Sequence, residues 1–406
     1  MFSYPIFYHM MQKPAPVEHG LTVWYDTDMV QKYEENYNSA FQNAVETKKL
    51  YLADALERES SSLLGRLDLS DWDEEQRRRA YEQDVLPYWE KFGQTPKQMW
   101  FELYGSRDHR MDPRFMPADL YYNDILPYMN NGMQQHGLMN KGYLDYLFSD
   151  VKRPETVALN IEGVYTDEKR NIISEDTLID LCRERGGTLF LKRSTGSKGG
   201  KGITVFEPDS CTDEDISGIF RDAGSSFIVQ EQIKQHPQIE KINPSSVSTI
   251  RILSLILDDK VSVESAVLRV SSPDMPYVSM HDGGFYAEIL EDGKLYPKAY
   301  DNNGAWIDRQ NAPFDDSFMV PFMDKVCDEV KRIHPRMAHF KCIGWDFAID
   351  EDGDPILIEF NIFPGIDCSQ LTCCKPIFGD KTDWILEDYF LHRTWEQNHR
   401  QDVLIY

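Results

Sequence analysis

The segment 342–362 constrains the fold most strongly, because it has the pattern of two strands joined by a tight turn. It reads CIGWDFAID, then EDGD, then PILIEFNI. Asp352-Gly353 is typical of a two-residue hairpin loop. With these two residues as the loop, Asp346 and Glu359 lie directly opposite each other, and such cross-strand pairs have Cβ atoms about 5 Å apart. The hairpin is therefore predicted to hold two carboxylates side by side.

Side-chain alternation divides this hairpin into an apolar face and a polar face. The apolar face is predicted to carry Ile343, Trp345, Phe347, Ile349, Ile356, Ile358, Phe360 and Ile362. The other face is predicted to carry Gly344, Asp346, Ala348, Leu357, Glu359 and Asn361. Two carboxylates and an amide can hold a divalent cation through oxygen atoms, and magnesium is expected because it uses few carboxylates together with substrate phosphates. The alternative is a solvent-facing hairpin whose acidic residues are neighbours by accident.

A second feature, residues 189–203, is a strand that leads Lys192 into a glycine-rich loop, LFLKRSTGSKGGKGI. Such a loop can direct successive backbone N–H groups at phosphate oxygens. Between Arg185 and Phe206 there are five basic residues and no acidic residue, although the chain has a formal net charge of −25. The segment is not a P-loop, because Gly202 stands where that motif needs a hydroxyl residue. An anion site is predicted, with a flexible hairpin tip as the alternative.

Arg251 is the third feature, because it interrupts the apolar run 249–257, TIRILSLIL. Burying an unpaired charge in such a strand is costly, so Arg251 needs an anionic partner. A phosphate group is the functional candidate, and a structural salt bridge remains the alternative. The preceding segment 227–233, FIVQEQI, is predicted to be an apolar strand that ends in polar residues.

The order of these parts resembles the ATP-grasp superfamily, and more narrowly its sugar-transfer-associated branch, which is linked to exopolysaccharide synthesis. The resemblance covers about two thirds of the chain, and it rests on residues 87–92, 117–130, 140–141, 192 with its glycine loop, 229–233, 248–251, 343–346 and 359–361. It implies an α+β fold in which two α+β subdomains clamp ATP, preceded here by a mostly helical N-terminal region. Many ATP-grasp enzymes begin with an α/β substrate domain instead, so their substrate rules cannot be transferred.

The expected domains follow from the resemblance and from the pattern of helix and strand signals. They are a helical region at 1–135, a first ATP-grasp subdomain at 136–226, a second one at 227–380 and a C-terminal segment at 381–406. Expected helices cover 28–60, 70–87, 95–105, 175–185 and 314–333. Expected strands cover 156–159, 188–192, 227–233, 249–257 and 261–271.

The resemblance also implies roles for individual residues. Lys141 and Lys192 would contact nucleotide phosphates, Arg251 would face the transferred phosphoryl group, and Arg251 and Lys192 are the expected catalytic residues. The expected nucleotide-binding residues are Lys141, Lys192, Ser194, Thr195, Gly196, Ser197, Lys198, Gly199, Gly200, Gln230, Glu231, Gln232, Ile233, His236 and Glu240. The expected metal ligands are Asp346, Glu359 and Asn361, and the expected cofactors are ATP and Mg²⁺.

The function that the resemblance implies is an ATP- and Mg²⁺-dependent carboxylate–amine ligase that acts through an acyl phosphate. Its partners would be a small-molecule carboxylate and an amine, and a sugar acid or an amino acid for a surface polysaccharide is the implied substrate class. Two alternatives remain open. One is a small-molecule kinase, and the other is a non-catalytic nucleotide-binding partner of glycosyltransferases.

Composition narrows the possible partners and the location. Acidic residues number 68 and basic residues 43, and this excess would repel a phosphate backbone, so no nucleic-acid partner is expected. No apolar run approaches the roughly 20 residues of a membrane span, and the N-terminal residues lack the pattern of a signal peptide. A cytoplasmic protein without a transmembrane segment is expected. The seven cysteines lack zinc-ligand spacing and are expected to be reduced thiols, with a nucleophile among Cys368, Cys373 and Cys374 as the alternative.

Overall fold

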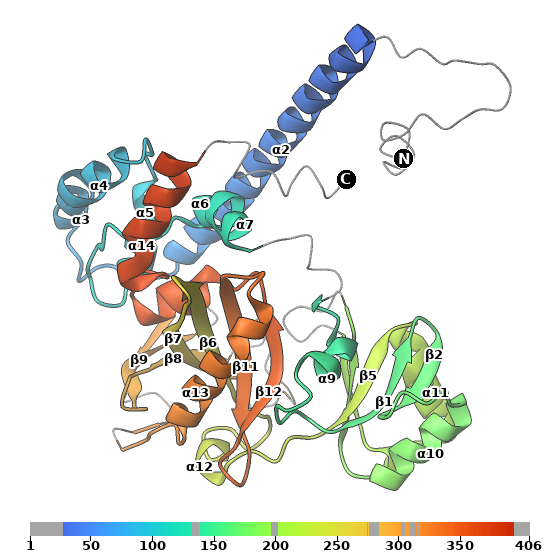
Figure 1. The fold of residues 1–406 in the computed structure, drawn as a ribbon. Coiled ribbons are helices and arrows are strands. Elements are labelled where there is room, and N and C mark those ends of the chain that lie inside the picture. The colour runs from blue at the N-terminus through green and yellow to red at the C-terminus, as the bar shows by residue number, and fades with distance from the viewer. Residues whose placement is uncertain are drawn as a thin grey trace, which may run out of the picture.

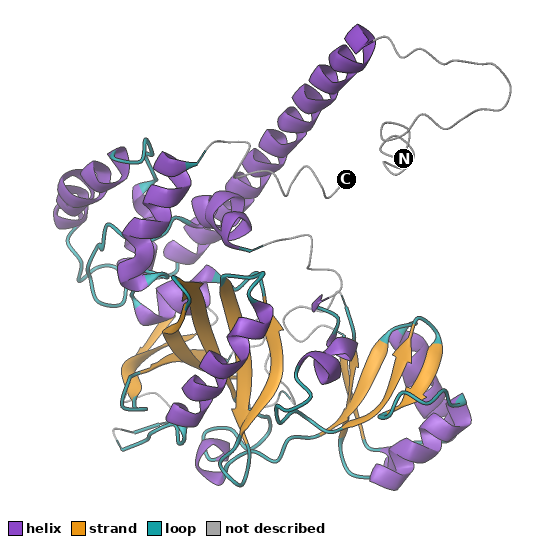
Figure 2. Cartoon of the chain, in the orientation of Figure 1, coloured by secondary structure: helices purple, strands orange, loops and turns teal. Residues whose placement is uncertain are grey.

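The structure is a computed structural model that describes residues 27–130, 138–195, 202–273, 275, 284–301, 305–308, 314–315 and 317–393. Three parts are visible in Figure 1: a layer of helices, a seven-stranded sheet against it, and a five-stranded sheet beside the larger one. Colouring by secondary structure shows that the strands are confined to the two sheets (Figure 2). The predicted α+β fold with a helical N-terminal region is confirmed.

The smaller sheet has the strand order β2-β1-β5-β3-β4, and its paired strands are antiparallel. The strands are β1 (Thr156–Ile161), β2 (Val164–Asp167), β3 (Leu189–Arg193), β4 (Ile203–Phe206) and β5 (Phe227–Glu231). Because β5 lies between β1 and β3, the predicted subdomain boundary after residue 226 is wrong. The first subdomain includes Glu231, since pairing on both sides fixes β5 in this sheet.

Two helices, α10 (Glu175–Arg185) and α11 (Asp213–Ala223), pack on the smaller sheet. As predicted, α10 begins after Ser174, whose Oγ accepts a hydrogen bond from the Thr177 N–H at 3.1 Å. It ends at Gly186, which has a φ of 61° and so occupies a conformation that favours glycine.

The larger sheet has the order β10-β9-β8-β7-β6-β11-β12 and carries most of the predicted site. Its strands are β6 (Thr249–Leu257), β7 (Lys260–Val270), β8 (Phe285–Ile289), β9 (Leu295–Asp301), β10 (Ala305–Asp308), β11 (Cys342–Ile349) and β12 (Pro355–Asn361). Helix α13 (Met323–Ile333) packs on one face through Val326, Val330 and Ile333, against a core that includes Trp345 and Phe347. Helix α12 (Pro237–Glu240) precedes β6. The opposite face carries the predicted site and also contacts the helical layer.

The hairpin β11–β12 shows why Asp346 and Glu359 face each other, and the reason differs from the predicted one. The loop has three residues rather than two, because the Asp350 N–H bonds to the Asp354 carbonyl and Gly353 has a φ of 81°. This shifts the pairing by one residue, so that Phe347 faces Leu357. A β-bulge between Asp346 and Phe347 then restores the predicted pairing of Asp346 with Glu359.

The predicted face of Leu357 is wrong for the same reason. Beyond the bulge the side chains of β12 alternate out of step with the predicted register. Leu357 is fully buried in the cluster that contains Trp345 and Phe347, on the core side of the sheet.

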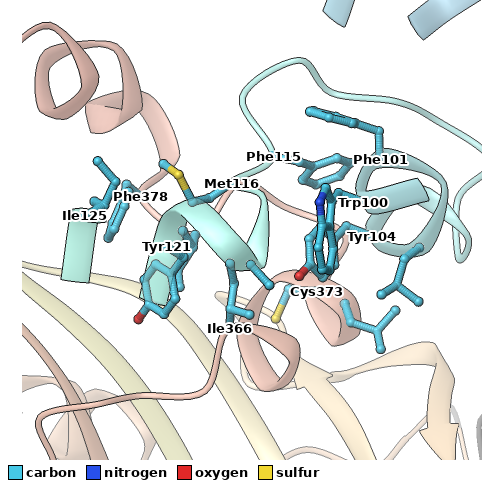
Figure 3. Packing of buried hydrophobic residues seen from close by; sticks show 14 of the residues in the cluster. Trp100, Phe101, Tyr104, Phe115, Met116, Tyr121, Ile125, Ile366, Cys373 and Phe378 are labelled. Atoms are coloured by element: carbon cyan, nitrogen blue, oxygen red, sulfur yellow. The ribbon is translucent and has the colours of Figure 1, made fainter. Parts of the chain in front are cut away.

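The helical layer comprises residues 27–130 together with the C-terminal helix α14 (Thr382–Glu387). It contains α2 (Thr27–Leu64), α3 (Glu74–Ala80), α4 (Leu86–Glu90), α5 (Gln98–Gly105), α6 (Ala118–Leu120) and α7 (Leu126–Met129), with π-helical turns at Tyr81–Val85 and Tyr121–Ile125. Its buried side chains form one cluster with Leu253, Val267 and Tyr286 of the larger sheet. Figure 3 shows part of this cluster, in which Trp100, Tyr121 and Phe378 lie near Ile366 and Cys373. The described part of the segment after residue 380, which ends at residue 393 and was predicted as separate, therefore packs as part of the helical layer through Leu386 and Tyr389.

The starts of two predicted helices shift in the structure. The second helix begins at Glu74, since the Asp73 carboxylate rather than Ser70 accepts the Gln76 N–H at 3.0 Å. The helix predicted at 314–333 begins only at Met323. Strands β2, β4, β8, β9 and β10 were not predicted, since short strands give a weak pattern. Within the described part of the chain, no helix is both long enough and apolar enough to cross a membrane.

Candidate functional site

Asp346 lies at the centre of a charged cluster on the face of the larger sheet that the helical layer also contacts. Strand register places it opposite Arg251 of β6 on one side and Glu359 of β12 on the other. Arg251 contacts it through both Nε and Nη2, with Nη2 at 2.8 Å from Oδ2. Asp346 is only 3% exposed. Burial alone would raise the pKa of Asp346, but Arg251 and Arg269 beside it lower the pKa below its usual value.

Arg251 therefore has the anionic partner that its buried position requires, and that partner is a predicted metal ligand. The salt bridge left open as an alternative describes this contact. Contact of Arg251 with a transferring phosphoryl group stays a prediction. Gly344 makes room for this arginine, because a Cβ at that position would lie 3.4 Å from Arg251 Nη1 and 3.0 Å from Pro364 Cβ.

Arg269 of β7 is a residue that the sequence reasoning missed. Its Nη1 lies 3.2 Å from Asp346 Oδ2, and the residue is 7% exposed. Its Nε is buried without a hydrogen-bond partner among the described residues. The available signal was the one that identified Arg251, a single arginine within an apolar strand, here AVLRV at 266–270.

Lys141 and Lys192 bring the smaller sheet into the same cluster. Lys141 Nζ lies 3.3 Å from Glu359 Oε2, and Lys192 Nζ donates to Gln230 Oε1 at 3.1 Å. Burial lowers the pKa of Lys192 to about 8, while Glu359 acts in the opposite direction and Lys141 adds to the lowering. The two predicted phosphate-binding lysines and the predicted metal ligands thus meet where the two sheets face each other.

Local structure explains the position of Lys141. Asn140 caps a short 3₁₀ turn at Lys141–Tyr143, since its Oδ1 accepts the Gly142 N–H at 2.8 Å. The Lys141 N–H donates to the Ser194 carbonyl at 3.0 Å, directly after β3. Lys141 is therefore tied to the end of the strand that carries Lys192.

The donor set on β11 and β12 fits a magnesium ion. Asp346, Glu359 and Asn361 supply two carboxylates and one amide from adjacent strands, and Mg²⁺ takes oxygen ligands of this kind, together with phosphates. Asn361 Nδ2 is buried without a hydrogen-bond partner among the described residues, so no hydrogen bond from that atom to them fixes the orientation of this amide. Among the described residues there is no cluster of three or more His, Cys, Asp or Glu side chains that could hold a metal. A metal site here would therefore depend on the amide and on a bound ligand.

The remaining predicted nucleotide residues are only partly brought together. Ser194 is buried, Thr195 is exposed, and Gly196, Ser197, Lys198, Gly199 and Gly200 lie outside the described residues. The Glu231 N–H donates to the Glu155 carbonyl at 2.9 Å, and the Gln232 N–H to the Thr188 carbonyl at 3.2 Å. These two N–H groups are thus engaged within the protein, whereas Ile233 is half-buried at the start of the link to the larger sheet.

His236 and Glu240, expected near the ribose, lie at the two ends of α12: His236 directly precedes the helix, and Glu240 is its last residue. His236 caps this helix through Nδ1, which accepts the Gln238 N–H at 3.3 Å, and its ring packs edge-on against Phe322. Glu240 is exposed at the end of α12. These contacts explain His236 as a capping residue, and a ribose contact by either residue stays a prediction.

A cavity of about 810 Å³ lies away from this cluster, between the helical layer and strands β9 and β10. Its lining contains none of the predicted site residues and comprises Arg107, Asp108, His109, Tyr296, Pro297, Lys298 and Asp308. The guanidinium of Arg107 is already committed, because its nitrogens donate to Asp108, Glu288 and the carbonyls of Thr372 and Cys373. Arg107 therefore has no N–H group left to offer a nucleotide phosphate in this cavity.

The cysteine side chains that the structure describes give no support to a nucleophilic thiol, and the side chain of Cys368 lies outside the described part. The six whose side chains are described are free thiols, and Cys373 and Cys374 are buried. Burial raises the pKa of the Cys374 thiol to about 12, which keeps it protonated.

Comparison with known proteins identifies one family. The model of the sugar-transfer-associated ATP-grasp family matches residues 139–382. Solved structures with similarity include the D-Ala:D-Ser ligase of Enterococcus faecalis, at 14% identity over 61% of each chain and a TM-score of 0.38. The D-alanine–D-alanine ligase of Bacillus anthracis matches at 15% identity over 63% of this chain and 67% of that one, with a TM-score of 0.36.

Biotin carboxylase of Campylobacter jejuni is a third solved structure with similarity, at 11% identity over 66% of this chain and 50% of that one, with a TM-score of 0.40. The chain spans less than two thirds of the first of these relatives, and all three similarities are remote. No curated protein matches the chain.

Proposed function

The chain belongs to the sugar-transfer-associated ATP-grasp family, and from this premise we propose that it uses ATP and Mg²⁺ to join a carboxylate to an amine through an acyl phosphate. The single observation that carries the proposal is the meeting of Lys141 and Lys192 with Glu359, which is the cross-strand partner of Asp346. Lys192 of β3 and Lys141, in the turn tied to the end of β3, face this carboxylate pair of the larger sheet. This is an arrangement suited to polyphosphate held between two sheets.

Lys141 and Lys192 would bind the phosphates from the side of the smaller sheet. Lys192 is partly buried and lies beside another cation, and both conditions lower its pKa. A bound phosphate would raise this pKa again, because its negative charge favours the protonated lysine. The segment Gln230–Ile233 would border the adenine ring, and the glycine-rich loop after Thr195 would cover the phosphates. The nucleotide would thus lie between a first subdomain that ends near residue 231 and a second one that follows it.

Asp346, Glu359 and Asn361 would hold the magnesium ion, which neutralises phosphate charge when bound. Arg251 and Arg269 keep Asp346 ionised and therefore able to act as a ligand. Both arginines would also stabilise negative charge on the transferring group, an electrostatic contribution that is large in enclosed sites.

The chemistry needs the acceptor carboxylate in line with the γ-phosphorus. A carboxylate oxygen forms a bond to this phosphorus as the bond to the ADP oxygen breaks, which gives an acyl phosphate and ADP. The amine nitrogen then attacks the acyl carbon, inorganic phosphate leaves, and the nitrogen loses a proton. The amide, ADP and phosphate are the products.

The substrate class that we propose is a sugar acid or an amino acid used in surface-polysaccharide biosynthesis. The family name supports this part of the proposal. The protein would act in the cytoplasm on small molecules.

The test is to trap the acyl phosphate with hydroxylamine. ATP, Mg²⁺ and a panel of hexuronic acids and α-amino acids are supplied without amine, and the hydroxamate is measured together with ADP. We expect a hydroxamate with at least one acid, and its loss in Lys192→Ala and Glu359→Ala. A stable phosphate ester of a hydroxyl, with no hydroxamate and no dependence on amine, would replace the ligase with a kinase.

A further inference from the structure

The loop Ile362–Ile366 leaves β12 directly after the predicted metal ligand Asn361, and its hydrogen bonds run to the helical layer. Three side chains of residues 121–130 hold it. The contacts are Asn130 Nδ2 to the Ile362 carbonyl, Tyr121 Oη to the Pro364 carbonyl at 3.0 Å, and the Ile366 N–H to Tyr122 Oη at 3.2 Å. The path of this loop is therefore set by residues of the helical layer, far away in sequence.

The same loop borders the charged cluster. Pro364 lies against the site face, since a Cβ on Gly344 would be 3.0 Å from Pro364 Cβ. That position is two residues before Asp346 and also 3.4 Å from Arg251 Nη1. A displacement of the loop would therefore change the space next to Arg251.

Asn130 connects the loop to the start of β11 as well. Its Oδ1 accepts the Cys342 N–H at 3.0 Å, and its Nδ2 donates to the Cys342 carbonyl at 2.7 Å. Asn130 is fully buried. One amide thus fixes the first residue of β11 relative to the first residue after β12, the two strands that carry the predicted metal ligands.

Packing holds these contacts in place. Ile366 and Tyr121 are fully buried in the cluster that joins the helical layer to the sheet, and Figure 3 shows both next to the short helix that carries Tyr121. Further along, the Gln370 side chain, also fully buried, bonds to the Met116 N–H at 2.8 Å and to its carbonyl at 3.0 Å. The loop is therefore held at both ends by the helical layer.

We propose that the helical layer contributes to the site of phosphoryl transfer. Through Tyr121, Tyr122 and Asn130 it positions the loop 362–366, and this loop forms the side of the site that aligns the acceptor carboxylate. The inference rests on the proposed function and assigns a role to the N-terminal region. These three are positioning residues, because they act through the loop and not on the reacting atoms. Alignment of an acceptor oxygen with the γ-phosphorus tolerates little displacement, so loosening the loop slows transfer without removing the nucleotide site.

The experiment compares conservative variants that remove one hydroxyl each. Tyr122→Phe and Tyr121→Phe delete the bonds to Ile366 and Pro364. Tyr81→Phe is the matched control, because its Oη donates to the Pro96 carbonyl at 2.7 Å with both groups inside the helical layer. Measurements are the kcat of ADP release with the best acid of the panel, the KM for ATP, MgADP affinity by calorimetry, Tm, and hydrogen exchange of a peptide that contains Ile366.

For Tyr122→Phe we expect a kcat about tenfold lower, a KM for ATP and an MgADP affinity within about twofold of wild type, and faster exchange at Ile366. Tyr121→Phe should behave alike, and Tyr81→Phe should keep the wild-type kcat even if its Tm falls as much. If the wild type is active but Tyr122→Phe and Tyr121→Phe have the same kcat as Tyr81→Phe, the positioning role alone is overturned. A wild type that releases no ADP with any acid overturns the proposed function and the acceptor role together.

Discussion

Asp346 and Glu359 are both predicted metal ligands, yet the structure predicts that their removal has very different effects on the metal-free protein. Asp346→Asn takes the anion away from two buried arginines, whose side chains are 12% and 8% exposed. Removing one partner of a buried ion pair typically costs about 3–5 kcal/mol, because a charge is left buried without compensation. Glu359→Gln loses a contact to Lys141 in which Glu359 is 33% exposed, and such pairs contribute about 0–1 kcal/mol.

Asp150 offers a matched control, because it also joins two arginines, Arg332 and Arg336, but at the surface. Its side chain is 52% exposed, against 4% for Asp346. Solvent screens this triad, so Asp150→Asn should leave stability almost unchanged. The comparison isolates burial, since the substitution and the number of arginine partners are the same.

The assay is hydrogen exchange in EDTA, read on peptides that cover β6 and β11, with urea unfolding followed by circular dichroism. A loss of 3–5 kcal/mol in local stability corresponds to exchange faster by about two to three and a half powers of ten. All variants are then titrated with MgADP, and both Asp346→Asn and Glu359→Gln should lose the stabilisation that depends on Mg²⁺. Equal destabilisation by Asp346→Asn and Asp150→Asn, or by Asp346→Asn and Glu359→Gln, would refute the reasoning about the buried arginines.

Three further predictions concern single residues. Burial lowers the pKa of His334 to about 4, so this histidine is protonated in the unfolded chain before it is protonated in the folded one as the pH falls below about 6.5. The free energy of unfolding should therefore drop by about 2 kcal/mol between pH 7.5 and pH 5. His334→Gln should remove this pH-dependent change in the urea midpoint. Lys192 has a pKa of about 8 without ligand, so MgATP binding at pH 8.5 should be accompanied by proton uptake. Calorimetry in two buffers of different ionisation enthalpy would measure this uptake, and it should be absent in Lys192→Arg, because arginine stays protonated. Gly344→Ala should cost about 1–3 kcal/mol by crowding Arg251 and Pro364, and it should lower kcat more than MgADP affinity.

Much of the fold was predictable because its signals are local. The apolar runs predicted β1, β3, β5, β6 and β7 to within about two residues. The family resemblance, rather than a pattern of charges, assigned Lys141 and Lys192 to one site, and the structure places both near Glu359. The Asp346–Glu359 pair was predicted correctly, but only because a three-residue loop and a β-bulge shift the register in opposite directions. Neither feature has a reliable sequence signal, and the wrongly predicted face of Leu357 is the consequence.

The contacts that could not be predicted join segments far apart in the chain. Arg269 of β7 reaches Asp346 of β11 across the intervening strand β6, and the sequence contains no pattern for that pairing. The side-chain bonds from Tyr122 and Asn130 to the loop after β12 span more than 200 residues. Local propensity carries no information about such tertiary partners, so the role of the helical layer became visible only in three dimensions.

The charge of the whole chain also gives little information about the field at the site. The protein carries a formal net charge of −25, yet in the described cluster four cations, Lys141, Lys192, Arg251 and Arg269, face the two carboxylates Asp346 and Glu359. Charges in close contact outweigh distant ones, which salt screens over about 8–10 Å. The cluster therefore carries a local excess of positive charge within an acidic molecule. Under the proposed function this excess would attract a nucleotide phosphate at short range, while the negative net charge of the chain disfavours extended polyanions such as nucleic acids.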